Sequence, residues 1–184
     1  MKRTLIVLMV MALMLFSFSV MAEAYTAQTA GDFEVKLGID FGGDFDYGAG
    51  STDADMGYSL IGEYKYAYNQ NINLGAGLNY QFDRDFDGDD GDFSFTTAYA
   101  LGEYKVTDSP VYLIGQLGYG SLSVDSTNPE LTGDESGGLY YAAGAGMTLD
   151  NDYTAEVLYS RNNGELDDND VEYDKFTISI GIRY

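Results

Sequence analysis

The chain of 184 residues contains no cysteine, no histidine and no tryptophan, and only 2 prolines. Without cysteine it can form neither a disulfide nor a thiol nucleophile, and without histidine it lacks the most common metal ligand and the usual general base at neutral pH. Basic residues are also scarce, since 9 Lys and Arg stand against 30 Asp and Glu, for a net charge of −21. Binding of nucleic acid needs clustered Lys and Arg, so this composition argues against a nucleic acid partner.

The N-terminal residues differ in character from the rest of the chain. A basic start precedes an uninterrupted apolar run, Leu5–Phe16, and a site rich in small residues. This order predicts a secretory signal peptide over residues 1–22, cleaved after Ala22; cleavage after Ala24 also fits the small-residue rule. Residues 23–31 then form a short N-terminal segment. The alternative is an uncleaved membrane anchor, although a spanning helix needs about 20 apolar residues.

From residue 32 onward, apolar residues alternate with polar or small ones at a period of two, which is typical of β-strands with two chemically different faces. The fourth segment keeps this phase only with a β-bulge near Thr96 or Thr97, because one extra residue moves the following side chains to the other face. We expect eight strands, over residues 33–47, 56–68, 72–82, 93–106, 111–121, 139–149, 153–161 and 175–184.

The connections between these segments alternate in length. Tight turns at 69–71, 107–110 and 150–152 separate four longer polar loops. Short turns on one side and long loops on the other are typical of bacterial outer-membrane barrels, whose periplasmic turns are short and whose external loops are long. Closure of the sheet also removes its free edges, whose backbone N–H and C=O groups would find no hydrogen-bond partner in lipid.

Alternation alone does not decide which face contacts lipid, because a soluble barrel would turn its apolar face inward around a ligand. Charged and small side chains on the polar face favour a narrow, crowded interior, and aromatic residues near the strand ends suit girdles at two membrane interfaces. We therefore predict an all-β fold, an eight-stranded antiparallel up-and-down transmembrane β-barrel over residues 32–184. A secreted soluble ligand-binding barrel is the alternative.

Eight charged side chains on the polar face are expected to point into the barrel near the ends of the strands that meet the short turns. A charge buried alone is costly, so four acids and four bases are expected to pair in an interior charge network. Separate solvated charges in a water-filled lumen are the alternative. The predicted members are Glu34, Lys36, Glu63, Lys65, Glu103, Lys105, Glu156 and Arg183.

Three segments, 110–120, 141–147 and 176–184, resemble the eight-stranded outer-membrane β-barrel family of the outer-membrane protein A transmembrane domain and the opacity-type, porin-like proteins. The resemblance covers residues 32–184. The ending is similar to the C-terminal signal that the barrel-assembly machinery reads. That similarity implies an assembly signal in which alternate residues face lipid and the last one is the terminal aromatic, namely Phe176, Ile178, Ile180, Ile182 and Tyr184.

The resemblance implies an integral protein of the cell outer membrane. The resemblance also implies that enzymes among the relatives of this size use a catalytic histidine beside Asp, Ser or Glu. This chain has no histidine, so we expect no enzymatic activity. An eight-stranded barrel is about filled by its own side chains, which favours a structural or surface-interaction role over the alternative, a small porin-like channel. The expected partners are outer-membrane lipid, lipopolysaccharide and the barrel-assembly machinery, with a surface or host ligand left open and the barrel itself monomeric.

Eighteen of the thirty acids fall in the four long loops. In the second loop Asp83, Asp85, Asp87 and Asp89 have the alternate spacing of a calcium loop. The match is partial, because Ser94 stands where a bidentate Glu would close the site. We expect a solvated acidic surface without a metal cofactor, and the alternative is weak Ca²⁺ binding or divalent bridging to lipopolysaccharide.

Overall fold

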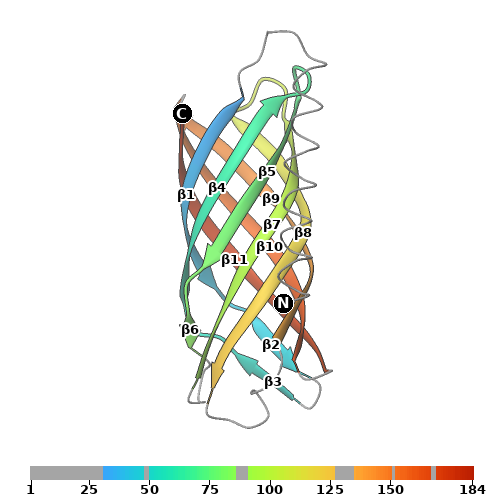
Figure 1. The fold of residues 1–184 in the computed structure, drawn as a ribbon. Coiled ribbons are helices and arrows are strands. Elements are labelled where there is room, and N and C mark those ends of the chain that lie inside the picture. Colours follow the sequence, from blue (N-terminus) through green and yellow to red (C-terminus); the bar gives the residue numbers. More distant parts are fainter. Residues whose placement is uncertain (1–30, 48–49, 86–90, 127–134, 151, 167–168) are drawn as a thin grey trace. The chain divides into compact units, whose positions relative to one another are not determined.

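The computed structural model describes residues 31–47, 50–85, 91–126, 135–150, 152–166 and 169–184. The predicted signal peptide and almost all of segment 23–31 lie outside these residues. Within them, no helix is long and apolar enough to cross a membrane. The unit Gly31–Tyr184 is built from antiparallel strands strongly tilted to a common axis (Figure 1).

Eight of the strands close into a barrel in which each is hydrogen-bonded to the next along the chain. Pairing of the first with the last completes the closure, with Glu34 opposite Arg183 and Phe41 opposite Phe176. The predicted eight-stranded up-and-down β-barrel is thus confirmed. Its strands are β1 (Asp32–Phe41), β4 (Gly57–Ala67), β5 (Ile72–Gln81), β7 (Gly91–Lys105), β8 (Val111–Ser126), β9 (Glu135–Asp150), β10 (Tyr153–Leu166) and β11 (Asn169–Arg183).

The two ends of the barrel differ, as the alternating connections predict. We call the end that carries the turns β4–β5, β7–β8 and β9–β10 the short-turn end; the C-terminus lies there (Figure 1). Backbone bonds close its turns, from Tyr68 N to the Ile72 carbonyl at 2.9 Å and from Val106 N to the Val111 carbonyl at 3.0 Å. The opposite end, which carries the longer connections, is called the long-loop end.

At the long-loop end the wall consists of the longer strands β7 to β11 together with three short strands. Strands β7 to β11 contain 14 to 16 residues, whereas β1, β4 and β5 contain 10 or 11. The short strands β2 (Asp44–Tyr47), β3 (Gly50–Asp53) and β6 (Arg84–Asp85) extend the wall: β2 pairs with β11 and β3, and β6 pairs with β7. The sequence pattern therefore underestimated the length of the later strands.

The single strand predicted over 33–47 is wrong. Strand β1 ends at Phe41, and Gly42 and Gly43 follow with φ angles of 61° and 120°. Glycine adopts such angles without the steric cost that a Cβ atom brings. The two glycines interrupt the strand and shift its register by one residue, so that β2 continues to pair with β11 beyond β1.

The β-bulge predicted near Thr96 or Thr97 is also wrong. Strands β7 and β8 pair in one unbroken register over all 15 residues of β7. Phe93 and Phe95 therefore keep the phase of Glu103, and all three are buried inside the barrel. No change of phase is needed, because the interior at the long-loop end accepts large apolar side chains.

The outward face of the barrel is apolar and the inward face carries the charges. Leu37, Leu117 and Ile180 are 60 to 67% exposed on the outside, whereas Glu34 and Lys36 are at most 1% exposed. A soluble barrel would need the reverse arrangement, with apolar side chains inside. The structure thus favours the membrane barrel over the soluble alternative.

Candidate functional site: the barrel interior

The interior near the short-turn end contains a compact cluster of charged side chains, which we call the basal network. All of its members are at most 3% exposed. Alternation places them on the inward face of four different strands, β1, β4, β7 and β10, because every second residue of a strand shares a face. The members are Glu34, Lys36, Glu63, Lys65, Glu103 and Glu156.

In the basal network two ammonium groups form ion pairs with four carboxylates. Lys36 Nζ lies 2.7 Å from Glu63 Oε2 and 2.6 Å from Glu156 Oε2. Lys65 Nζ lies 2.7 Å from Glu34 Oε2 and 2.9 Å from Glu63 Oε2. It also contacts the carboxylate of Glu103.

The carboxylates of Glu34, Glu63 and Glu103 approach one another closely enough to share one ion, with oxygen atoms within 4.8 Å. The ammonium group of Lys65 contacts all three, so a side chain of the protein already supplies the cation there.

Tyrosine and glutamine side chains from β7 and β8 add hydrogen bonds to two of these acids. The hydroxyl of Tyr99 donates to Glu63 at 2.8 Å, and that of Tyr112 donates to Glu156 at 2.8 Å. Gln116 Nε2 lies 3.3 Å from Glu63 Oε1 and accepts a bond from the Tyr140 hydroxyl at 2.6 Å. These partners were missed in the sequence, where tyrosines read only as apolar or girdle residues.

Two glycines make room for the tyrosine rings. Gly77 on β5 lies directly opposite Tyr99 on β7, and Gly146 on β9 lies opposite Tyr112 on β8. A Cβ atom at Gly77 would lie 2.6 Å from the Tyr99 ring, and one at Gly146 would lie 2.4 Å from the Tyr112 ring. Each ring therefore lies flat against its neighbouring strand.

One of the eight predicted network members lies elsewhere. Lys105, at the last position of β7, is exposed and forms no ion pair with any described residue. Arg183 is partly exposed and lies 3.6 Å from Glu34 Oε2. The expected pairing of four acids with four bases is corrected accordingly: strand phase placed Lys105 on the inward side, but its position beyond the last buried residue leaves it at the barrel mouth.

A second ionic group crosses the middle of the barrel, and the sequence analysis did not identify it. Lys175 Nζ lies 2.9 Å from Asp40 Oδ2 and donates to Gln81 Oε1 at 2.8 Å. The Asp40 carboxylate also accepts bonds from Ser59 and from Thr177, the latter at 2.5 Å. Asp40 shares the phase of Glu34 and Lys36, so the strand pattern contained the signal that it points inward.

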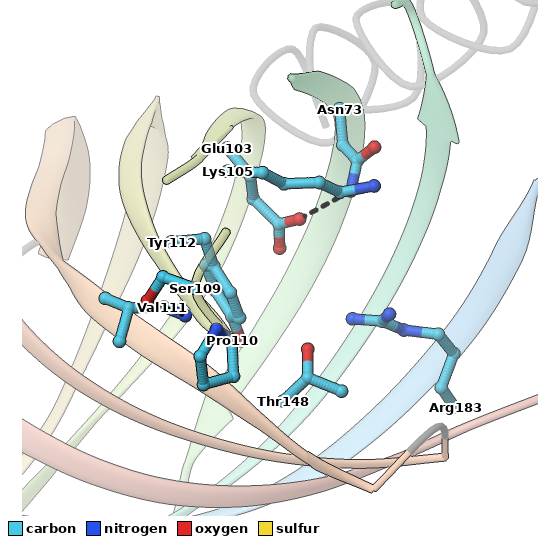
Figure 2. A pocket seen from close by; sticks show the side chains of 9 residues that line it. All are labelled: Asn73, Glu103, Lys105, Ser109, Pro110, Val111, Tyr112, Thr148 and Arg183. Carbon is cyan, nitrogen blue, oxygen red and sulfur yellow. Dashed lines mark hydrogen bonds between the residues drawn. The ribbon is translucent and has the colours of Figure 1, made fainter. Parts of the chain in front are cut away.

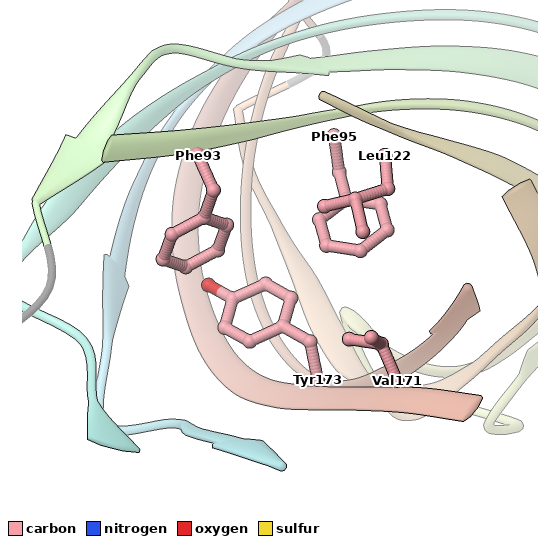
Figure 3. Packing of buried hydrophobic residues seen from close by; sticks show 5 residues of the cluster. All are labelled: Phe93, Phe95, Leu122, Val171 and Tyr173. Atoms are coloured by element: carbon pink, nitrogen blue, oxygen red, sulfur yellow. The ribbon is translucent and has the colours of Figure 1, made fainter. Parts of the chain in front are cut away.

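Above this pair, at the long-loop end, the interior is apolar. Phe93, Phe95, Leu122, Val171 and Tyr173 form a buried cluster in which the Tyr173 ring stacks on Phe95 at 5.3 Å and meets Phe93 edge-on at 4.9 Å (Figure 3). We call this cluster the apolar plug. Its members come from β7, β8 and β11, so it fills the space between facing walls.

Arg84 connects the apolar plug to the wall. Its guanidinium donates to the hydroxyl of Tyr173, to the Gly42 carbonyl at 2.7 Å and to the Ala54 carbonyl at 3.0 Å. It also donates to the carbonyl of Asp55. Arg84 stands between two aspartates of the predicted second loop, yet the structure buries its side chain at 1% exposure.

The residues of the predicted assembly signal lie on the last strand and beyond its end. Tyr184 is 75% exposed, and its backbone exchanges hydrogen bonds with Phe33 at 2.8 and 3.1 Å. Phe176 stacks on Phe41 at 6.2 Å. The remaining members, Ile178, Ile180 and Ile182, are exposed on the outer face.

Of the four aspartates with calcium-loop spacing, Asp83 and Asp85 are exposed at the long-loop end. Asp87 and Asp89 lie outside the described residues. The geometry of a calcium site in this loop therefore stays a prediction.

The family model described as "Outer membrane protein beta-barrel domain" matches residues 10–184. No curated protein matches the sequence. Several solved structures have a similar fold. Ail, the attachment invasion locus protein of Yersinia pestis, is 20% identical with a TM-score of 0.59, over 84% of this chain and 99% of that one.

Two further barrels show the same likeness. Neisserial surface protein A is 18% identical with a TM-score of 0.59, over 86% of this chain and 100% of that one. The N-terminal β-barrel domain of Pseudomonas aeruginosa OprF is 13% identical with a TM-score of 0.53, over 85% of this chain and 100% of that one. At such identities the likeness concerns the fold alone.

Proposed function

The chain belongs to the outer membrane protein beta-barrel domain family, and we propose that this member acts as a surface-interaction barrel, not as an open channel or an enzyme. It is an outer-membrane protein, with the short-turn end on the periplasmic side and the long-loop end outside the cell. The observation that carries the proposal is the filled interior. Function then lies on the external surface, where long connections meet solvent.

Side chains bond across the lumen at several levels. Gln116 and Glu63, 3.3 Å apart, come from β8 and β4, which are separated by two intervening strands. Lys175 on β11 reaches Gln81 on β5 in the same way. Above them the apolar plug excludes a hydrated path, because an ion passing it would lose its water without gaining polar contacts. These contacts support a closed barrel.

The external end is acidic, which determines the chemistry of a partner. Asp53, Asp55, Asp83 and Asp85 are all exposed there. Ail has been crystallised with the heparin analogue sucrose octasulfate, a polyanion. The charge of this chain opposes such a ligand, so we assign it a cationic partner surface, attracted over about a Debye length of 8 to 10 Å.

The test uses the purified protein in lipid nanodiscs at physiological salt. A hexalysine peptide is titrated in parallel with sucrose octasulfate, and binding is followed by calorimetry. We expect saturable binding of hexalysine alone. A variant carrying Asp53→Asn, Asp55→Asn, Asp83→Asn and Asp85→Asn should bind it more weakly, whereas Asp108→Asn, in a short turn, is the matched control that should leave binding unchanged.

Conductance in planar bilayers separates the proposal from the channel alternative. A filled barrel should give no stable single-channel steps. Regular steps would overturn the closed-barrel interpretation and favour a small channel, and failure to bind hexalysine would overturn the cationic-partner assignment.

The same proposal includes the route to the membrane. We infer that residues 1–22 direct export, that 23–31 form a short segment before the barrel of 32–184, and that the C-terminal strand is read by the barrel-assembly machinery. The barrel is then a monomer in contact with lipid and, at its external rim, with lipopolysaccharide.

A further inference from the structure

A small pocket opens at the periplasmic mouth of the barrel, opposite to the proposed surface site. Its volume is about 90 Å³, and it lies between the β7–β8 turn and the ends of β9 and β11 (Figure 2). The polar side chains that line it include Lys105, Ser109, Thr148 and Arg183. We call this space the mouth pocket.

The two least satisfied cations of the described chain both line the mouth pocket. Lys105 forms no ion pair with a described residue, and Arg183 has only Glu34, at 3.6 Å. The Arg183 Nε atom is buried without a hydrogen-bond partner among the described residues. The other five cations of the described residues have close partners. Carboxylates lie within 3.1 Å of four of them, namely Lys36, Lys65, Arg161 and Lys175. Arg84 donates to backbone carbonyls and to a tyrosine hydroxyl.

The pocket offers donors for an anion. Arg183 and Thr148 face the same space from one side and Lys105 from the other (Figure 2). The one acid in the wall, Glu103, contacts Lys65, which it shares with other carboxylates of the basal network, and accepts a bond from Asn73 at 2.9 Å. Two cations and a hydroxyl provide donors for the free oxygens of a phosphate group, of which a phosphodiester headgroup has two and inorganic phosphate has four.

Hydrogen bonds fix the backbone from which these three side chains reach the pocket. Lys105 N donates to the Asn71 carbonyl at 2.7 Å, and Arg183 N donates to the Asp152 carbonyl at 2.7 Å. Thr148 N donates to the Pro110 carbonyl at 2.9 Å.

We propose that the mouth pocket binds a phosphate group on the periplasmic side of the outer membrane. The group belongs either to the headgroup of a phospholipid of the inner leaflet or to free phosphate. Lys105 and Arg183 supply the charge, and Thr148 orients the group. The acid-rich loops are at the other end of the barrel, where exposed charges are screened within about 10 Å. At the mouth, Lys105 and Arg183 oppose the two carboxylates by which the basal network exceeds its ammonium groups.

The experiment observes Arg183 directly. Protein purified from ¹⁵N-grown cells is placed in micelles of dodecyl maltoside, a detergent without a phosphate group, and inorganic phosphate is titrated against chloride at constant ionic strength. The Nε–Hε resonance of Arg183, assigned by its loss in Arg183→Lys, should shift saturably. In Lys105→Gln the dissociation constant should rise about fivefold, the effect of losing one partly solvated charge.

The lipid arm distinguishes the two sources. If phosphatidylglycerol nanodiscs shift the resonance without added phosphate, the headgroup is the ligand; if only the titration shifts it, free phosphate is. Arg161, paired on the outer surface with Glu172 and Asp174, provides the control resonance, which should not move. A shift that is linear, shared by Arg161 or unaffected by Lys105→Gln would overturn the proposal.

Discussion

Lys65 Nζ lies 2.7 Å from Glu34 Oε2 inside the barrel, and the two side chains come from adjacent strands, β4 and β1. Lys65 also contacts Glu63 and Glu103, so one ammonium group holds three buried carboxylates together. Breaking a buried ion pair by removing one partner costs about 3 to 5 kcal/mol, because the remaining charge is left without compensation.

We therefore expect Lys65→Met to lower the free energy of unfolding by about 3 to 5 kcal/mol. Urea-induced unfolding of the refolded protein in detergent measures the change, with thermal unfolding as a second observable. Lys105→Met is the matched control, since Lys105 is exposed and should have no measurable effect. Glu63→Gln should also destabilise the barrel, and unchanged unfolding in both network variants would contradict the network.

Arg84 should stabilise the long-loop end selectively. It donates to backbone carbonyls beside β1 and β4 and to Tyr173, so it connects segments that no strand ladder joins. Arg84→Lys keeps the charge but loses the planar fork of donors. We expect a loss of about 1 to 3 kcal/mol and faster cleavage by added protease at the external end, while Arg161→Lys, on the outer surface, should leave cleavage unchanged. Equal cleavage rates would refute this role for Arg84.

The strand phase predicted which side chains enter the barrel but not how deep they lie. Glu34, Glu63 and Glu103 follow directly from alternation. Lys105 has the correct phase, yet it lies at the mouth because phase carries no information about height along the axis. Arg84 could not be predicted, since it lies in a connection without periodicity and its partners are mostly backbone carbonyls.

Hydrogen bonds across the lumen could not be predicted from the sequence either. The bond between Tyr140 and Gln116, and that between Gln116 and Glu63, depend on the tilt and stagger of strands far apart in the sheet. The wrong bulge in β7 has a similar origin. It assumed that Phe95 must face outward, whereas the apolar plug provides an apolar environment inside.

The stability of the barrel should depend on the absence of a side chain at Gly77. An added Cβ atom would lie 2.6 Å from the Tyr99 ring, which is itself fixed by its bond to Glu63. Gly77→Ala should therefore destabilise the barrel by about 1 to 3 kcal/mol through overpacking. Gly115→Ala is the control, because nothing lies within 4 Å of a Cβ atom there. Similar melting temperatures for the two variants would contradict this reading of the Tyr99 site.

The acidic second loop should remain solvated in the presence of calcium. Asp83 and Asp85 are exposed, and Ser94 stands where a closing bidentate ligand would be needed. Calorimetric titration at physiological salt should show no saturable heat at calcium concentrations below about 1 mM, the range of weak extracellular sites. Tight binding that is lost in Asp83→Asn would instead establish a metal site.

Deletion of Tyr184 should reduce assembly in cells more than folding in vitro. Tyr184 is 75% exposed and contacts Phe33 through its backbone, so its side chain contributes little to the barrel itself. We propose that the terminal aromatic instead acts in recognition by the assembly machinery before the barrel closes. Heated and unheated gel samples of outer-membrane fractions measure assembly, and refolding into detergent measures folding. Tyr68→Ala provides the control, because Tyr68 is an aromatic residue at the same end and is 62% exposed. We expect Tyr68→Ala to assemble normally, and equal assembly of the Tyr184 deletion would remove the C-terminal signal as the explanation.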